Sequence, residues 1–282
     1  MSTLIAQTYP GSTNLKLVHI LIAVIITLAL IFAGVTWVAP IGLSYYAAKK
    51  APAVTRVVPT ELKDNSVSGA PGQKLSYFGY AFEVPWTDLD ETQTKLYPKD
   101  KPVKNRADLR FHSGLRVLVT AIPPREWASG LAANFHASPQ AIEAAFGHDA
   151  ANSDYRFVKA LYEFSPDNMN HWAMSLGTYN RDQFLLIIKS LALLKSAESG
   201  IFRLQSQDYL GFQEGSPRVR QDGIAIHLFS DDGSIEMIFF QKDYQNPQGI
   251  TQPEINRIVQ SLHKSVEVQP HHSPQSRSDA RD

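Results

Sequence analysis

At 282 residues the chain is long enough for one large domain or two small ones, and one large domain is the simpler organisation. Its 27 basic and 27 acidic residues cancel, which argues against a nucleic-acid partner because such partners are attracted by excess positive charge. The absence of cysteine excludes disulfides, thiolate metal sites and a cysteine nucleophile.

The first predicted element is a transmembrane helix over residues 17–39, and the apolar sequence allows it to extend to about residue 48. No Asp, Glu, Lys or Arg occurs between Lys16 and Lys49. About 23 residues at ~1.5 Å each reach ~35 Å, which covers a hydrocarbon core of about 30 Å. We therefore predict a retained membrane anchor, preceded by an N-terminal tail over residues 1–16.

A cleaved signal peptide is the alternative, but its apolar core is normally only about 7–15 residues long. The sequence gives two opposing signals for the side of the membrane on which the domain lies. Lys49, Lys50 and Arg56 outnumber Lys16 and so favour a cytoplasmic domain, whereas an uncleaved signal anchor followed by one long domain usually places that domain outside. We expect an extracytoplasmic domain, with the lipid bilayer as the partner of the helix.

A linker is predicted over residues 51–74, which are rich in Pro, Gly, Ser and Val and lack a helical or strand period. A soluble domain is predicted over residues 75–266. It opens with a strand in which Tyr80, Phe82 and Val84 alternate with smaller or polar residues, the period of two that marks one buried face.

Two further strand regions follow the same period. The first covers residues 109–122, with Ser113 and Gly114 as a bulge or turn. The second is an antiparallel hairpin with the inward residues Ile224, Ile226, Leu228, Ile235, Met237 and Phe239. Between them, residues 211–215 lack the basic residue and the helix of a phosphate-binding loop, and they are predicted to form a turn.

Helices are predicted between and after these strands. Ser138 and Pro139 begin the first, which ends near Gly147, and the second covers residues 154–164. The third covers residues 180–196, with an apolar stripe formed by Phe184, Ile187, Ile188, Leu191 and Leu194.

The last predicted helix begins at Thr251, which has capping-box spacing to Glu254. Its buried stripe is predicted to contain Ile255, Ile258, Val259 and Leu262. The polar tail over residues 267–282 is predicted to be disordered because it contains almost no apolar residue to bury.

These elements predict an α+β protein: a single N-terminal transmembrane helix followed by one soluble domain with a mainly antiparallel sheet and packed helices. The segment GYAFEVPW over residues 79–86, the later hairpins and INRIVQSL over residues 255–262 resemble the plan of PsbP-like α/β/α sandwich domains. The resemblance covers the two ends of the domain. It implies a sandwich fold and, since those domains are mostly binding or assembly modules, a binding role.

One short motif suggests catalysis. The stretch DLDET, which begins at Asp88 and includes Asp90, looks like the Asp-x-Asp-x-Thr motif of haloacid-dehalogenase-type phosphatases. In that motif the first aspartate attacks phosphorus, the second acts as acid and base, and a metal joins them. Asp231 and Asp232 would supply a distal acidic pair. Against this hypothesis, Pro85 interrupts the strand before the motif, and the distal pair turns directly into another strand.

The histidines do not form a recognisable metal motif. His112, His136, His148, His171 and His227 lack metal-ligand spacing, and the pair His271–His272 lies in the tail. We therefore predict no metal site, no cofactor and no catalytic residue. The leading hypothesis is a non-enzymatic domain that binds a membrane or envelope protein at the membrane surface, and the alternative is a membrane-bound metal-dependent phosphohydrolase that uses Asp88 and Asp90.

Overall fold

The computed structural model of the protein describes residues 12–97, 105–134, 138–171, 181–219, 223–240 and 249–265. The chain forms two compact units. The first combines Met1–Arg56 with Phe164–Leu191, and the second combines Val57–Glu163 with Ala192–Asp282.

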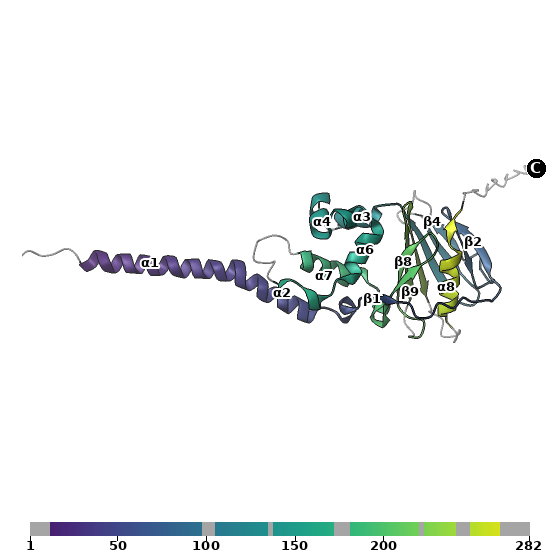
Figure 1. Ribbon diagram of the computed structural model, residues 1–282, viewed down its shortest axis with the longest axis horizontal. Helices are drawn as coiled ribbons and strands as arrows, with labels where there is room; N and C mark the ends of the chain where they lie inside the picture. The colour runs from purple at the N-terminus through teal and green to yellow at the C-terminus, as the bar shows by residue number, and fades with distance from the viewer. Residues whose placement is uncertain are drawn as a thin grey trace, which may run out of the picture. The chain divides into compact units, whose positions relative to one another are not determined.

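The first unit begins with one helical run, which contains α1 (Ser12–Ala33), the π-helical turn η1 (Gly34–Val38) and α2 (Ala39–Lys50) (Figure 1). Among the described residues, a single helix is long and apolar enough to cross a membrane, Ile22–Lys50, and a signal sequence shares these properties. The predicted N-terminal apolar helix is thus confirmed. It begins at Ser12 rather than at residue 17, while residues 1–11 of the predicted tail lie outside the description.

The π-helical turn lets the helix pass Pro40 without a break. Proline has no N–H to donate, and its ring crowds the carbonyl of the residue four positions earlier, here Thr36. The turn relieves this conflict because the N–H of Ala39 donates to the carbonyl of Gly34, five residues earlier. The helix therefore continues through Pro40 to Lys50.

The first unit also contains η2 (Ala53–Arg56), η3 (Pro166–Asn168) and most of α7 (Arg181–Ala192). Arg56 joins these pieces to the end of α2. Its Nη2 donates to the carbonyl oxygen of Ala48 at 2.7 Å, and its Nη1 lies 2.5 Å from Oδ1 of Asp167.

The predicted helix over residues 180–196 is present as α7, but the predicted apolar stripe is wrong in part. Ile188 is buried, whereas Ile187 and Leu191 are 47% and 70% exposed. Leu185 and Leu186, which lie outside the predicted stripe, are buried instead. The cause is that α7 is apolar on two faces, so that the period alone does not identify the packed one.

The second unit is built on an eight-stranded sheet with the order β1-β7-β8-β9-β10-β6-β5-β4. Only β1 and β7 are parallel; the other neighbours are antiparallel. The strands are β1 (Pro59–Glu61), β4 (Lys95–Tyr97), β5 (Arg106–Arg110), β6 (Arg116–Ile122), β7 (Ile201–Gln205), β8 (Leu210–Glu214), β9 (Ile224–Ser230) and β10 (Gly233–Phe240). The predicted α+β class with a mainly antiparallel sheet is confirmed.

One face of this sheet packs against a three-stranded sheet and α8 (Gln252–Ser261). The small sheet has the order β11-β3-β2, with β2 (Gln73–Tyr77), β3 (Tyr80–Val84) and β11 (His263–Lys264). As predicted, the core contains Tyr80, Phe82, Val84, Ile224, Ile226, Leu228, Ile235, Met237, Phe239, Ile255, Ile258, Val259 and Leu262. The alternating burial follows because successive side chains in a strand point to opposite faces.

The helical middle of the chain covers the opposite face of the sheet (Figure 1). It contains α3 (Glu126–Asn134), α4 (Pro139–Phe146), α5 (His148–Ala151) and α6 (Asp154–Glu163). The predicted helices at 138–147 and 154–164 correspond to α4 and α6. The N–H of Thr251 donates to Oε2 of Glu254 at 2.7 Å, so the predicted capping box of α8 is also present.

Two segments differ from their predicted conformation. Residues 51–74, expected to be a linker, contain η2 and the edge strand β1, because a three-residue strand is too short to display a period of two. Residues 211–215, predicted to be a turn, largely form β8 in the middle of the sheet. Gly211 is required there because a Cβ atom would collide with the carbonyl oxygen of His227.

Candidate functional site

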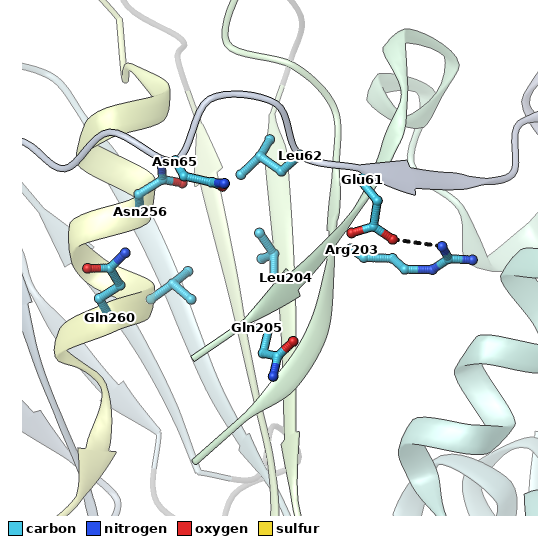
Figure 2. A pocket seen from close by; sticks show the side chains of 9 residues that line it. Glu61, Leu62, Asn65, Arg203, Leu204, Gln205, Asn256 and Gln260 are labelled. Carbon is cyan, nitrogen blue, oxygen red and sulfur yellow. Dashed lines mark hydrogen bonds and ion pairs between the residues drawn. The ribbon is translucent and has the colours of Figure 1, made fainter. Parts of the chain in front are cut away.

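A pocket of about 350 Å³ opens at the edge of the large sheet in the second unit (Figure 2). Its walls come from β1 and the segment that follows it, from β7 and from α8. The lining residues are Glu61, Leu62, Asn65, Arg203, Leu204, Gln205, Asn256, Val259 and Gln260. Leu204 and Val259 belong to the buried core, so the pocket is a place where that core approaches the surface.

Asn256 shapes one wall of the pocket. This side chain is only 4% exposed, and its Nδ2 donates to the carbonyl oxygens of Asp64 at 2.8 Å and Ser66 at 2.7 Å. Nε2 of Gln252, one turn earlier on α8, donates to Oδ1 of Asn256 at 3.0 Å. The amide of Asn256 thus fastens the segment after β1 to α8, because it satisfies backbone carbonyls that would otherwise be left unpaired.

The strand β7 presents a partly open edge to the pocket. β8 pairs with all of β7 from Ile201 to Gln205, whereas β1 pairs only with its first three residues, up to Arg203. Within the described part of the chain, Leu204 and Gln205 have no strand partner on the β1 side. An open edge of this kind is a template for a further strand.

The polar groups around the pocket suit a neutral ligand with both donors and acceptors. The side chains of Asn65, Gln205 and Gln260 are exposed and make no hydrogen bond to any other described residue. Glu61 and Arg203 pair with each other at 2.9 Å (Figure 2), so their charges offset, and the hydrogen bond that Arg203 donates to Glu61 raises the pKa of Arg203. Side-chain amides carry both kinds of hydrogen-bonding group, as does a peptide backbone.

The candidate phosphatase residues lie in a different region, beside the hairpin of β5 and β6. Oδ2 of Asp88 accepts a hydrogen bond from the N–H of Ser113 at 2.6 Å. Oδ1 of Asp90 accepts from the Thr92 hydroxyl at 2.6 Å and from the Gln93 N–H at 3.2 Å. The Thr92 hydroxyl, together with the backbone N–H groups of Gln93 and Thr92, lowers the pKa of Asp90. Both carboxylates therefore contribute to the local loop structure.

The distal acidic pair does not lie beside Asp88 and Asp90. Asp90 lines a second pocket, of about 310 Å³, with His112, whose Nδ1 lies 3.7 Å from Oδ2 of Asp90. Asp231 and Asp232 occupy the turn between β9 and β10, beside the end of β6 at Ile122. The other end of β6, at Arg116, lies near His112, and the two ends of this seven-residue strand are about 20 Å apart. No cluster of three possible metal ligands occurs among the residues whose side chains are described. The phosphohydrolase hypothesis stays a prediction, which metal-dependent phosphatase activity abolished by Asp88→Asn would support.

A buried polar cluster under α6 was not foreseen in the sequence. Oε1 of Glu214 on β8 accepts hydrogen bonds from the Tyr162 hydroxyl and from Nε2 of His227, the latter at 3.2 Å. Oε2 of the same carboxylate accepts from the N–H of Leu194 at 3.0 Å. Nδ1 of His227 lies 3.6 Å from Oε1 of Glu236 and has no hydrogen bond among the described residues. These contacts connect α6, β8 and β9 beneath the surface of the second unit.

The charges of this cluster determine the ionisation of His227. Burial works to lower its pKa, but the hydrogen bond to Glu214 and the negative charges of Glu214 and Glu236 outweigh burial, and the pKa is raised above 6.5. Burial also raises the pKa of Tyr162 well above its ordinary value. The imidazolium form of His227 donates to Glu214 through Nε2 and lies within ion-pair distance of Glu236 through Nδ1.

We therefore expect the free energy of unfolding to decrease as the pH rises above 6.5. Because the folded pKa of His227 lies above the unfolded value, its contribution to stability is full below pH 6.5 and is lost as the pH rises through the folded pKa. Denaturation of the full chain at a series of pH values would measure this slope. The variant His227→Gln should lose this component of the slope, and an unchanged slope would contradict the assignment.

The remaining histidines are dispersed. Nδ1 of His148, in α5, lies 2.7 Å from Oε1 of Glu143 in α4. Nδ1 of His171 lies 2.8 Å from the hydroxyl oxygen of Ser44. His136, the pair His271–His272 and the predicted disordered tail over residues 267–282 lie outside the described residues.

Comparison with protein-family models, with curated proteins and with solved structures finds no match to this chain. The resemblance to PsbP-like domains accordingly stays a prediction, and the candidate site rests on the geometry of this chain alone.

Proposed function

We propose that this protein is a membrane-anchored, non-enzymatic binding module. Its N-terminal helix is retained in the bilayer, and its α+β unit binds a protein partner at the membrane surface. The observation that carries this proposal is the uninterrupted helix from Ser12 to Lys50, with no Asp, Glu, Lys or Arg between Lys16 and Lys49. A retained anchor raises the effective concentration of a binding unit for partners in the same membrane.

The surface of this helix supports the anchor. Leu28, Leu30 and Phe32 are 60%, 69% and 70% exposed, and other exposed apolar residues occur around the whole circumference. Exposed apolar surface costs about 25 cal/mol per Å² in water, whereas a hydrocarbon core removes this cost. A continuous helix also satisfies its backbone hydrogen bonds internally, as a lipid environment requires.

We further propose that the binding unit is extracytoplasmic. Lys16 precedes the apolar run closely, as in a signal anchor that retains its N-terminus in the cytoplasm, and a long following domain is translocated largely regardless of its charge. Protease treatment of intact spheroplasts tests the side. Digestion of the unit without lysis supports an envelope role, and protection until lysis contradicts it.

The pocket at the sheet edge is the proposed binding site, and its ligand class is an extended polypeptide segment. Leu204 and Gln205 offer an open strand edge beside the line of β1. Asn65 and Gln260 provide amides for the backbone of a visiting strand. Strand addition of this kind takes its affinity from main-chain hydrogen bonds and its specificity from side-chain pockets.

A peptide selection tests this site. The full chain in lipid nanodiscs is expected to enrich binders from a random library of linear peptides. The variant Gln260→Trp fills the pocket and should weaken the enriched peptides by about tenfold or more, because it blocks the strand edge. Gln140→Trp, on the exposed surface of α4, is the matched control and should leave binding unchanged. Equal binding by the two variants would exclude the pocket.

A further inference from the structure

The outward face of α7 is apolar. Its residues Ile187 and Leu191 belong to no described core cluster. Leu185, Leu186 and Ile188 are buried on one side of this helix, while Ile187 and Leu191 are exposed on the other. Residues four apart lie on the same face of a helix, so Ile187 and Leu191 form one patch. The other exposed large apolar residues described outside the N-terminal helix are Val58, Val67, Leu96, Leu210 and Val219. None of these forms such a helical pair.

The packing within the first unit fixes α7 to the end of the N-terminal helix. Leu186 of α7 and Ala48 of α2 belong to one buried cluster with Met169. The ring of His171 stacks on Tyr45, with centroids 3.7 Å apart. On the inner side of α7, Nζ of Lys189 donates to the carbonyl oxygen of Phe164 at 2.6 Å. The patch on α7 consequently faces away from the contacts that hold the helix.

The point of attachment lies close to the end of the apolar run. Ala48 follows Tyr46 by two residues, or about 3 Å along the helix axis. Tyr45 and Tyr46 are 55% and 62% exposed, and exposed tyrosines at the end of a membrane helix are typical of the headgroup layer. In a bilayer that holds the N-terminal helix, α7 would thus be attached at the depth where lipid meets water.

We propose that Ile187 and Leu191 insert into the interfacial layer of the bilayer that holds the N-terminal helix. This inference rests on the proposed membrane anchor and adds a second, peripheral lipid contact to it. Lipid is the occupant because the patch belongs to the unit that contains the anchor and is attached at headgroup depth. Amphipathic helices bury an apolar face of this kind about 5–10 Å into the boundary between headgroups and acyl chains.

The absence of cysteine in the natural chain makes a direct depth measurement possible. Single variants Leu30→Cys, Lys50→Cys, Ile187→Cys and Leu191→Cys of the full chain are spin-labelled in vesicles of phosphatidylcholine and phosphatidylglycerol. Power-saturation spectroscopy then compares collisions with oxygen, which partitions into lipid, and with a water-soluble nickel chelate. The labels at 187 and 191 should show an oxygen-to-nickel ratio at least about threefold that of the label at 50, since they lie in the interface.

The label at Leu30 separates failure of this inference from failure of the anchor. Lipid exposure at position 30 with water exposure at positions 187 and 191 would overturn the α7 contact and leave the anchor intact. Water exposure at position 30 would overturn the anchor itself. Labels at 187 and 191 that are shielded from both reagents would show that protein, either a second copy or a different partner, covers the patch, and would also overturn the lipid contact.

Discussion

Replacing Ile26 and Leu30 together with arginine is expected to remove most of the full-length chain from the carbonate-resistant membrane fraction. Both side chains are exposed on the N-terminal helix and lie one turn apart. An arginine near the centre of a membrane helix costs about 2.5–3.5 kcal/mol on the scale derived from insertion experiments, so the pair costs about 5–7 kcal/mol. Alkaline extraction of membranes followed by immunodetection measures the change.

The matched control places two arginines on exposed apolar positions of the second unit. Val58 and Val67 are 41% and 45% exposed, and their double arginine variant should stay in the membrane fraction at the level of the natural chain. Unchanged membrane retention of the Ile26→Arg, Leu30→Arg variant would contradict a spanning role for this helix.

Replacing Glu214 with alanine is expected to lower the free energy of unfolding of the second unit by about 3–5 kcal/mol. The substitution removes the acceptor for Tyr162, for the His227 ring and for the N–H of Leu194. The buried imidazole of His227, whose pKa is raised, then has Glu236 as its one remaining carboxylate neighbour among the described residues. Most of the lost free energy of unfolding comes from buried polar groups that are left without partners. Denaturant titration of the full chain, followed by tryptophan fluorescence, measures the loss.

Glu163→Ala is the control for the loss of a carboxylate as such. The Glu163 side chain is 40% exposed and pairs with Arg203 at the surface, so its removal should cost about 1 kcal/mol or less. Glu214→Gln keeps an acceptor oxygen and should lose less stability than Glu214→Ala. A loss below about 1 kcal/mol for Glu214→Ala would contradict a structural role for the cluster.

The parts of the fold that could be predicted are those with one apolar face. β3 alternates cleanly because one side packs in the core and the other does not, and α8 combines a capping box with a single apolar stripe. α7 and β8 lack this asymmetry. α7 is apolar on both sides, and β8 is buried on both faces while containing Gly211 and the polar pair Gln213 and Glu214.

The candidate site could not be read from the sequence because its parts are distant in the chain. Glu61 and Arg203, which pair across the pocket edge, are 142 residues apart. The strand β1 that leaves part of β7 open is only three residues long, too short for a pattern. Asp88 and Asp90, in contrast, match a local motif, and in the structure both accept hydrogen bonds from the backbone of nearby loop segments.

The most direct test of the membrane-anchor proposal is the intact mass of the chain recovered from carbonate-washed membranes of cells that produce the natural sequence. The proposal predicts a carbonate-resistant chain that still contains the N-terminal helix. A carbonate-released chain whose N-terminus lies beyond the apolar run would show that the helix is a cleaved signal sequence, and would contradict the anchor, the lipid contact of α7 and the tethered binding role together.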